Sequence, residues 1–224
     1  MNRNIPLSEN EYYHVFNRGV DKRKVFLDHK DYERFLFLLG ACNDKLPLLN
    51  STFFYKGLGS LDAFFKNRVR NKLVEVLSFC LMPNHFHLIL KQREEKGISR
   101  FLQKVSTGYA MYFNNKNERT GALFQGAFKS KHIGDDKYLK TLVRYVHLNP
   151  LELEEPNWKE NGILDIKRTT SFLKDYPWSS LSDYLGSKKF SLIVDYQVND
   201  EEDDFKQFLS DLNAAPTIEV SLQL

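Results

Sequence analysis

Two histidines one residue apart, His85 and His87, lie in the apolar stretch LMPNHFHLIL at residues 81–90. Successive side chains of a β-strand point to opposite faces, so a strand through this stretch directs both imidazoles to one side of a sheet. Imidazole nitrogens are common ligands of divalent metals, but paired histidines in a sheet often only form hydrogen bonds. The pair alone therefore leaves a metal site and a structural pair both open.

A second polar group lies in DDKYLKTLVRYVHLNP, residues 135–150. At helical spacing, Tyr138, Tyr145 and Asn149 gather on one flank of an apolar stripe. That stripe consists of Leu139, Leu142, Val143, Val146 and Pro150. If the stripe packs on the sheet, the phenol and the amide lie over the histidine pair.

Each of these residues also has a structural explanation. Tyr145 fits an amphipathic residue at a helix–sheet edge, and Asn149 fits a helix cap before a proline. His147 falls about 160° around the helix from Asn149, so we exclude it as a partner ligand. Tyr138 is the nearest rival to Tyr145 on the same flank.

The elements that must position these residues follow from hydrophobic periodicity. Strands are predicted within residues 11–20, 74–83, 85–92 and 119–133, with Pro83-Asn84 as a tight connection. Helices are predicted over residues 28–42, capped by Asp28, and over 97–115 and 135–150, the last of them stopped by Pro150. This order predicts an α+β fold with a ferredoxin-like antiparallel sheet, helices on one face, and a further helix after the last core strand.

The chain is expected to form one domain over residues 1–190. Residues of about 44–72 fit the pattern poorly and are predicted to be a partly helical insertion. A segment of about 172–186 is expected to dock on the body. Residues 191–224 form an acidic C-terminal tail with the composition of a flexible segment.

The charge is unevenly distributed. Residues 196–224 carry a net −6, so the preceding 195 residues carry +9 within the overall +3. This imbalance suits a body that binds a polyanion, although it is equally typical of a merely soluble protein. Two cysteines without a CxxC pair, no secretory signal and no apolar run of about 18 residues predict a cytoplasmic protein without a membrane partner.

Five segments carry a family resemblance when taken together and in order. They are YYHVFNRG, LMPNHFHLIL, RTGALFQGAFKS, YLKTLVRYVHLNP and YPWSSLSDYLG, which span about residues 11–186. In this combination the chain resembles the HUH single-tyrosine transposases, with their transposase IS200-like domain. The closer resemblance is to the REP-associated tyrosine transposases.

The resemblance implies a role for each candidate residue. His85, His87 and Asn149 would bind a divalent cation, Mg²⁺ or Mn²⁺, although related enzymes often have a glutamine where this chain has Asn149. Tyr145 would be the nucleophile, carried on a catalytic helix. The expected activity is cleavage and transfer of single-stranded DNA near hairpins through a 5′-phosphotyrosine intermediate.

Single-stranded or hairpin DNA is the expected partner, held by a basic track with interleaved aromatic residues. The candidate DNA-binding residues are Arg18, Arg23, Arg119, Lys129 and Lys131. Basic residues are common on protein surfaces, so each one alone is a weak indication. Some relatives exchange catalytic helices between subunits, so a homodimer and use of Tyr145 in cis or in trans stay open.

Two other functions fit parts of the pattern. One is a non-catalytic nucleic-acid-binding protein derived from a transposase, and the other is a metal-dependent hydrolase in which Tyr145 only packs. A binding protein has no need of His85, His87 and Tyr145 together, so the complete set favours the transposase.

Overall fold

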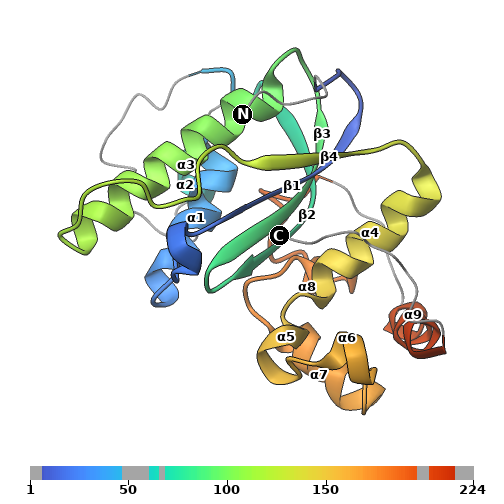
Figure 1. Ribbon diagram of the computed structural model, residues 1–224. Coiled ribbons are helices and arrows are strands. Elements are labelled where there is room, and N and C mark those ends of the chain that lie inside the picture. Colours follow the sequence, from blue (N-terminus) through green and yellow to red (C-terminus); the bar gives the residue numbers. More distant parts are fainter. Residues whose placement is uncertain (1–6, 47–60, 66–68, 196–201, 215–224) are drawn as a thin grey trace.

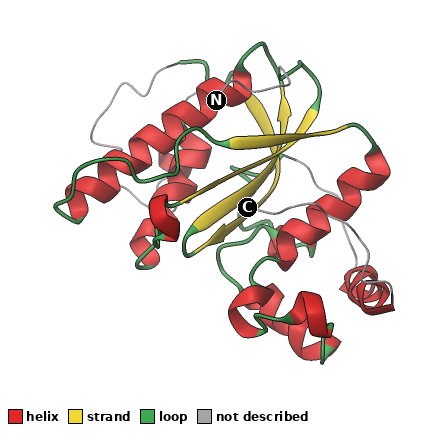
Figure 2. Cartoon of the chain, in the orientation of Figure 1, coloured by secondary structure: helices red, strands yellow, loops and turns green. Residues whose placement is uncertain are grey.

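The computed structural model describes residues 7–46, 61–65, 69–195 and 202–214. Within them, β1 (Tyr12–Arg18), β2 (Val74–Met82), β3 (His85–Gln92) and β4 (Lys129–Ile133) form one four-stranded sheet in the order β2-β3-β1-β4. All three strand pairs are antiparallel. The predicted α+β fold with an antiparallel sheet is therefore confirmed (Figure 2).

Helices cover both faces of this sheet, as Figure 1 shows. On one face lie α1 (His29–Ala41) and α3 (Gly97–Lys116), with the short α2 (Leu61–Phe65) beside α1; α4 (Asp136–Leu148) covers the other face. The remaining helices are η1 (Val20–Lys22), α5 (Leu151–Glu154), α6 (Trp158–Asn161), α7 (Ile166–Asp175), α8 (Leu181–Tyr184) and α9 (Glu202–Ala214). None of the described helices has the length and apolar content needed to cross a membrane.

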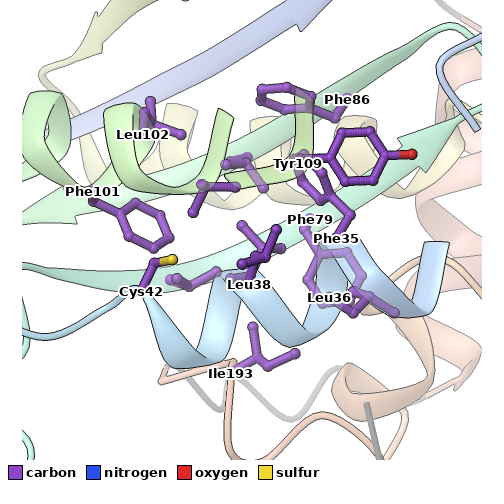
Figure 3. Close-up of a cluster of buried hydrophobic side chains, with 14 of the residues drawn as sticks. Phe35, Leu36, Leu38, Cys42, Phe79, Phe86, Phe101, Leu102, Tyr109 and Ile193 are labelled. Carbon is purple, nitrogen blue, oxygen red and sulfur yellow. The ribbon is translucent and has the colours of Figure 1, made fainter. Parts of the chain in front are cut away.

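The main core lies between the sheet and helices α1 and α3 (Figure 3). Its largest fully buried side chains include Phe35, Phe79, Phe86, Phe101 and Tyr109. The predicted cap of α1 is present, because the Asp28 carboxylate accepts a hydrogen bond from the backbone of Asp31 at 3.2 Å. Capping and the apolar stripe together fix α1 against the back of β2 and β3.

The β2–β3 turn at Pro83 and Asn84 is held by the loop that follows β1. The backbone nitrogens of Val25 and Gly19 donate to the carbonyls of Pro83 and Asn84, both at 2.8 Å. A Cβ at Gly19 would lie 2.3 Å from the carbonyl oxygen of Arg23, so only glycine fits there. This packing fixes the start of β3, where His85 lies.

The apolar stripe of α4 packs as predicted. Leu139, Leu142, Val143 and Val146 are buried against Leu77, Cys80, Met82, Ile89 and Ile133 of the sheet. Helix α4 ends at Leu148, with Asn149 as its C-cap directly before Pro150, as predicted. The backbone of Asn149 and Pro150 keeps helical dihedral angles and leads directly into α5, because proline is tolerated at the start of a helix.

Residues 176–184 lie along the outer edge of β2. The backbone nitrogen of Leu81 donates to the carbonyl of Trp178 at 2.9 Å, and that of Ser180 donates to the carbonyl of Phe79 at 3.0 Å. The Ser180 hydroxyl also lies 2.9 Å from Nε2 of His147 on α4. This segment therefore joins α4 to the edge of the sheet.

Two predicted regions fall partly outside the described residues. Of the insertion at about 44–72, residues 47–60 and 66–68 lie outside them, while α2 packs beside α1. Of the acidic segment 191–224, residues 196–201 and 215–224 lie outside them. Helix α9 within that segment buries Phe205, Phe208 and Leu209, which recur at helical spacing, against α5 and α7.

Candidate active site

The face of the sheet under α4 carries a cluster of polar residues. Arg18 lies opposite His85 and Phe16 opposite His87, while Lys129 and Lys131 of β4 lie opposite Phe16 and His14. Directly opposed residues of an antiparallel pair point to the same face. The register therefore brings His85 and His87 together with Arg18, Lys129 and Lys131, as well as with a third histidine, His14.

His14 and His87 form a buried pair. Nε2 of His14 lies 2.8 Å from Nδ1 of His87, and their rings stack with centroids 5.0 Å apart. One nitrogen of such a pair donates and the other accepts. With His14 accepting, His87 carries its proton on Nδ1 and keeps the lone pair on Nε2 for a ligand, which is how second-shell groups fix a metal-binding imidazole.

His85 has the same arrangement with a different partner. Its Nδ1 lies 2.7 Å from Oδ1 of Asn84. An amide oxygen only accepts, so Nδ1 of His85 holds the proton and Nε2 carries the lone pair. This Nε2 is buried and has no hydrogen-bond partner among the described residues. A buried nitrogen without a partner fits a ligand position, because such groups are otherwise satisfied within the fold.

Burial keeps all three imidazoles neutral. It lowers the pKa of His85 to about 3, helped by the charges of Arg18 and Lys159. It lowers the pKa of His14 to about 3, helped by Lys131. For His87, burial is again the main cause of a pKa well below the usual value. The neutral imidazole is the form that binds a metal, so no proton competes at pH 7.

Tyr145 is half-buried between α4 and α6. Its ring centroid lies 6.5 Å from that of Trp158, and Nζ of Lys159 lies 6.0 Å from the ring. Burial raises the pKa of the Tyr145 phenol, while the charge and hydrogen bond of Lys159 lower it. The charge of Lys159 also acts on His85 and His87. The charge of one ammonium group therefore acts on the phenol and on both histidines.

Asn149 caps the C-terminal end of α4. Its Nδ2 donates to the carbonyls of Val146 at 2.9 Å and Tyr145 at 3.3 Å. Its Oδ1 accepts no hydrogen bond within the described ranges. Nowhere in those ranges do three His, Cys, Asp or Glu side chains gather to hold a metal. The described residues therefore offer no third ligand of these four types beside His85 and His87, and the amide of Asn149 has a structural use as a helix cap.

Three of the predicted DNA-binding residues lie beside the histidines. A pocket of about 50 Å³ between β1 and β4 is lined by Phe16, Asn17, Arg18, Gln125, Ala127 and Lys129. Nε of Arg18 is buried without a partner in the described part of the chain, and Nζ of Lys129 lies 5.9 Å from the Phe16 ring. Lys131 lies two residues after Lys129 on β4, on the same face, and is half-buried. The pocket is therefore lined by two cationic side chains, Arg18 and Lys129, whose charges attract anions.

Arg23 and Arg119 lie away from this face. Arg23 is exposed in the loop after η1. The guanidinium of Arg119 donates to Oδ1 of Asn114 and, at 3.0 Å, to the carbonyl of Ala122. These bonds hold the loop that follows α3, so the side chain of Arg119 has a structural use of its own.

Sequence reasoning missed His14 and Lys159. His14 alternates with Phe16 and Arg18 along a predicted strand. Pairing that strand with β3 would have placed His14 on the same sheet face as His85 and His87. Lys159 follows Pro150 in a stretch with little periodicity, and its only signal was a basic residue beside a tryptophan. Only the folded chain brings it to Tyr145.

Comparison with known proteins identifies the family of this chain. The family model for "Transposase IS200 like" matches residues 8–149, a span that contains His85, His87, Tyr145 and Asn149. No curated protein matches the sequence. A solved structure of a REP-associated tyrosine transposase bound to a REP hairpin is similar, with a TM-score of 0.51 and 13% identity over 89% of this chain and 93% of that one. That similarity concerns the fold, whereas the family match covers most of the chain, and this chain belongs to the IS200-like transposase family.

Proposed function

We propose that this protein is a metal-dependent endonuclease and strand transferase for single-stranded DNA. It would cleave near hairpins through a 5′-phosphotyrosine intermediate on Tyr145. The observation that carries the proposal is the pair His85 and His87, buried with nitrogen lone pairs uncommitted, on the sheet face that α4 and Tyr145 cover. Membership in the IS200-like transposase family supports it.

The proposed cation ligands are Nε2 of His85, Nε2 of His87 and Oδ1 of Asn149. When bound, Mg²⁺ or Mn²⁺ supplies a Lewis acid that stabilises negative charge on phosphate oxygens. Hydrogen bonds to Asn84 and His14 fit this use, because Nδ1 of His85 donates to Asn84 and, with His14 as the acceptor, Nδ1 of His87 donates as well. The nitrogen–oxygen donor set suits either cation.

Tyr145 supplies the nucleophile. Its hydroxyl oxygen attacks the phosphorus of a DNA phosphodiester, a P–O bond to tyrosine forms, and the P–O3′ bond breaks. The phenol releases one proton and the departing 3′-oxygen takes one up, so protons and charge balance. The phosphotyrosine keeps a phosphodiester bond, so a 3′-hydroxyl can reverse the attack and join a new strand without ATP.

DNA would follow the basic residues beside the histidines. Arg18, Lys129 and Lys131 are proposed to neutralise backbone phosphates next to the cleaved one. Arg23 and Arg119 are proposed to contact DNA farther from the cleavage site. The similar solved structure is bound to a REP hairpin, which supports hairpin DNA as the substrate class.

Tyr145 is proposed to act in cis. Helix α4 packs on the sheet of its own chain, and His147 joins it to Ser180 beside β2. One chain thus holds the histidines and the tyrosine together, and a homodimer would keep one complete site per chain. The two buried free cysteines, Cys42 and Cys80, fit a protein of the cytoplasm, where thiols stay reduced.

To test this, the protein is incubated with hairpin DNA that carries a single-stranded flank, in the presence of Mg²⁺ or Mn²⁺. Formation of a covalent DNA–protein adduct is then measured. We expect wild-type protein to give a DNA–protein adduct that survives denaturation. Tyr145→Phe should abolish it, and the matched variant Tyr138→Phe should retain it. His85→Ala or His87→Ala should slow it by about 100-fold or more, as loss of a transition-state charge stabiliser does.

Three outcomes would contradict the proposal. Cleavage without an adduct would indicate a metal-dependent hydrolase. Hairpin binding without cleavage would indicate a binding protein derived from a transposase. Loss of the adduct in Tyr138→Phe, with Tyr145→Phe still active, would show that the nucleophile is Tyr138 and not Tyr145.

A further inference from the structure

Lys159 reaches Tyr145 from a part of the chain that the family match does not include. That match ends at residue 149, whereas Lys159 lies on α6. Among the described residues it is the cation whose charge acts on Tyr145, His85 and His87 alike. The segment after α4 therefore contributes to a site whose other residues lie within the matched region.

The position of α6 is fixed by packing. Trp158, the residue before Lys159, is buried with Leu148, Leu151 and Leu173 in a separate apolar cluster. The Trp158 ring also faces the Tyr145 ring at 6.5 Å. Because these contacts anchor the backbone of α6, the Lys159 side chain extends toward Tyr145 from a defined point.

Two groups hold the ammonium of Lys159. It forms an ion pair with the carboxylate of Glu152 on α5, and its nitrogen lies 6.0 Å from the centroid of the Tyr145 ring. Burial opposes the charge, but interactions with these two groups outweigh it and raise the pKa of Lys159, so the group stays protonated. A protonated ammonium only donates, so in any hydrogen bond between the two groups the phenol oxygen is the acceptor.

We propose that Lys159 is a further catalytic residue, whose ammonium donates a hydrogen bond to the Tyr145 hydroxyl oxygen and stabilises negative charge there during strand transfer. The proposal rests on the function proposed above. Negative charge forms on this oxygen when the phenol loses its proton before attack, and again when the phosphotyrosine bond breaks in the reverse direction. A donor already in place at the oxygen is effective because it needs no reorganisation during the reaction.

Lys159 keeps its proton throughout. In cleavage the phenol proton goes to solvent, the bond from tyrosine oxygen to phosphorus forms, and the 3′-oxygen leaves and takes up a proton. In strand transfer these changes run in reverse. Because the ammonium acts only by charge and hydrogen bonding, it serves both directions equally.

Glu152 gives the ammonium its orientation and offsets its charge. An unpaired ammonium would repel a divalent cation held at His85 and His87. The ion pair with Glu152 reduces that repulsion and restricts the flexible lysine side chain. Glu152 is therefore a positioning residue that acts through Lys159.

The experiment compares Lys159→Met, which removes the charge, with Lys159→Arg, which keeps a donor and a charge. The matched control is Lys167→Met, an exposed lysine on α7. Each variant is measured for the single-turnover rate of adduct formation and for affinity toward a hairpin with a non-cleavable phosphate analogue. We expect Lys159→Met to form the adduct about 10- to 100-fold more slowly with hairpin affinity changed less than about 3-fold. Lys159→Arg should recover most of the rate, and Lys167→Met should match wild type.

Two results would overturn the proposal while leaving the proposed function intact. One is wild-type adduct formation in Lys159→Met. The other is a rate loss that saturating hairpin restores, which would make Lys159 a DNA-backbone contact only. Absence of the adduct in wild-type protein would instead overturn the proposed function itself.

Glu152→Gln provides an independent check that leaves Lys159 in place. Freed from its ion pair, the ammonium should spend less time at the phenol, and adduct formation should slow by about 2- to 10-fold with hairpin affinity unchanged. An unaltered rate in this variant would show that Lys159 does not depend on Glu152 for its position. Thermal unfolding of each variant confirms that the fold is retained.

Discussion

The two faces of one sheet differ sharply in what they bury. The face under α1 and α3 is packed with aliphatic and aromatic side chains such as Phe86 and Leu88. The face under α4 is apolar only in part, and its other part holds His14, His85 and His87. Along β3 the two kinds of residue alternate, so adjacent positions of a single strand serve stability and chemistry separately.

This contrast has an energetic cause. Burying an aromatic side chain stabilises the fold by roughly 2–3 kcal/mol. Burying an imidazole nitrogen without a hydrogen-bond partner costs about 1–3 kcal/mol instead. Nε2 of His85 is such an atom. Such a group does not stabilise the fold, and the proposed role of His85 as a metal ligand would account for it.

The largest expected effect on stability lies on the apolar face. Phe86→Ala should lower the free energy of unfolding by about 3–5 kcal/mol, because it leaves a cavity between β3 and the two helices. Urea unfolding of the metal-free protein measures the change. His85→Ala, one residue earlier, is the control and should change stability by less than about 1 kcal/mol. Similar losses at both positions would remove the contrast between the faces.

A pH dependence should come from the polar face. His14 and His85 have folded pKa values of about 3, against an ordinary value of 6.5. Between these values the unfolded chain binds protons that the folded chain does not, so stability is full above pH 6.5 and falls as the pH drops. From pH 6.5 to 5.5 these two residues should remove about 2 kcal/mol, and His87, whose pKa is also lowered by burial, should add to the loss. Urea unfolding in chelator at several pH values measures this loss.

His14→Gln serves as the control, since it removes one of the three buried imidazoles and should flatten the dependence by about a third. Equal stability at pH 6.5 and 5.5 in the wild-type protein would mean that these histidines are not buried as neutral groups.

A smaller effect should follow from the hydrogen bond between His14 and His87. His14→Phe removes the acceptor for Nδ1 of His87 while keeping a stacked ring, and should weaken Mn²⁺ binding by about 10-fold. His14→Gln places an amide oxygen near the same point and should keep most of the affinity. Calorimetry on DNA-free protein measures both. Equal Mn²⁺ affinity in His14→Phe and wild type would show that His14 only fills space.

The smallest effect is expected at the anion pocket. Lys129→Ala should weaken hairpin binding by about 2- to 5-fold and reduce the slope of log affinity against log salt by about 1. Lys30→Ala, on α1 over the opposite face, should alter neither quantity. Fluorescence anisotropy at several salt concentrations gives both values. An equal effect at Lys30 would mean that DNA contacts the molecule without preference for the α4 face.

Strand faces, helix stripes and helix caps could be predicted from the sequence, because each depends on residues close together in the chain. Alternation in LMPNHFHLIL placed both histidines on one face, and the stripe from Leu139 to Val146 predicted how α4 packs. Asp28 was identified as a cap because capping depends on a few neighbouring residues. Each of these features is specified within one or two turns of chain.

Features that join distant parts of the chain were not predictable in this way. His14 and His87 are 73 residues apart, and their contact depends on the pairing of β1 with β3. The approach of Lys159 to Tyr145 depends on burial of Trp158 among residues of α5 and α7. The docking of α9 depends on the same cluster. A single sequence has no periodic signal for such contacts, because their partners lie on other elements.

The amide of Asn149 has a consequence for how the proposed site retains its cation. An aspartate there could not donate to the carbonyls of Tyr145 and Val146, so the helix end requires a neutral residue. With two neutral imidazoles, the proposed ligands then carry no formal charge. The full double charge of the cation is left for the DNA phosphate to balance. Metal and DNA are therefore expected to bind as reciprocal effectors, each raising the affinity for the other by the same factor.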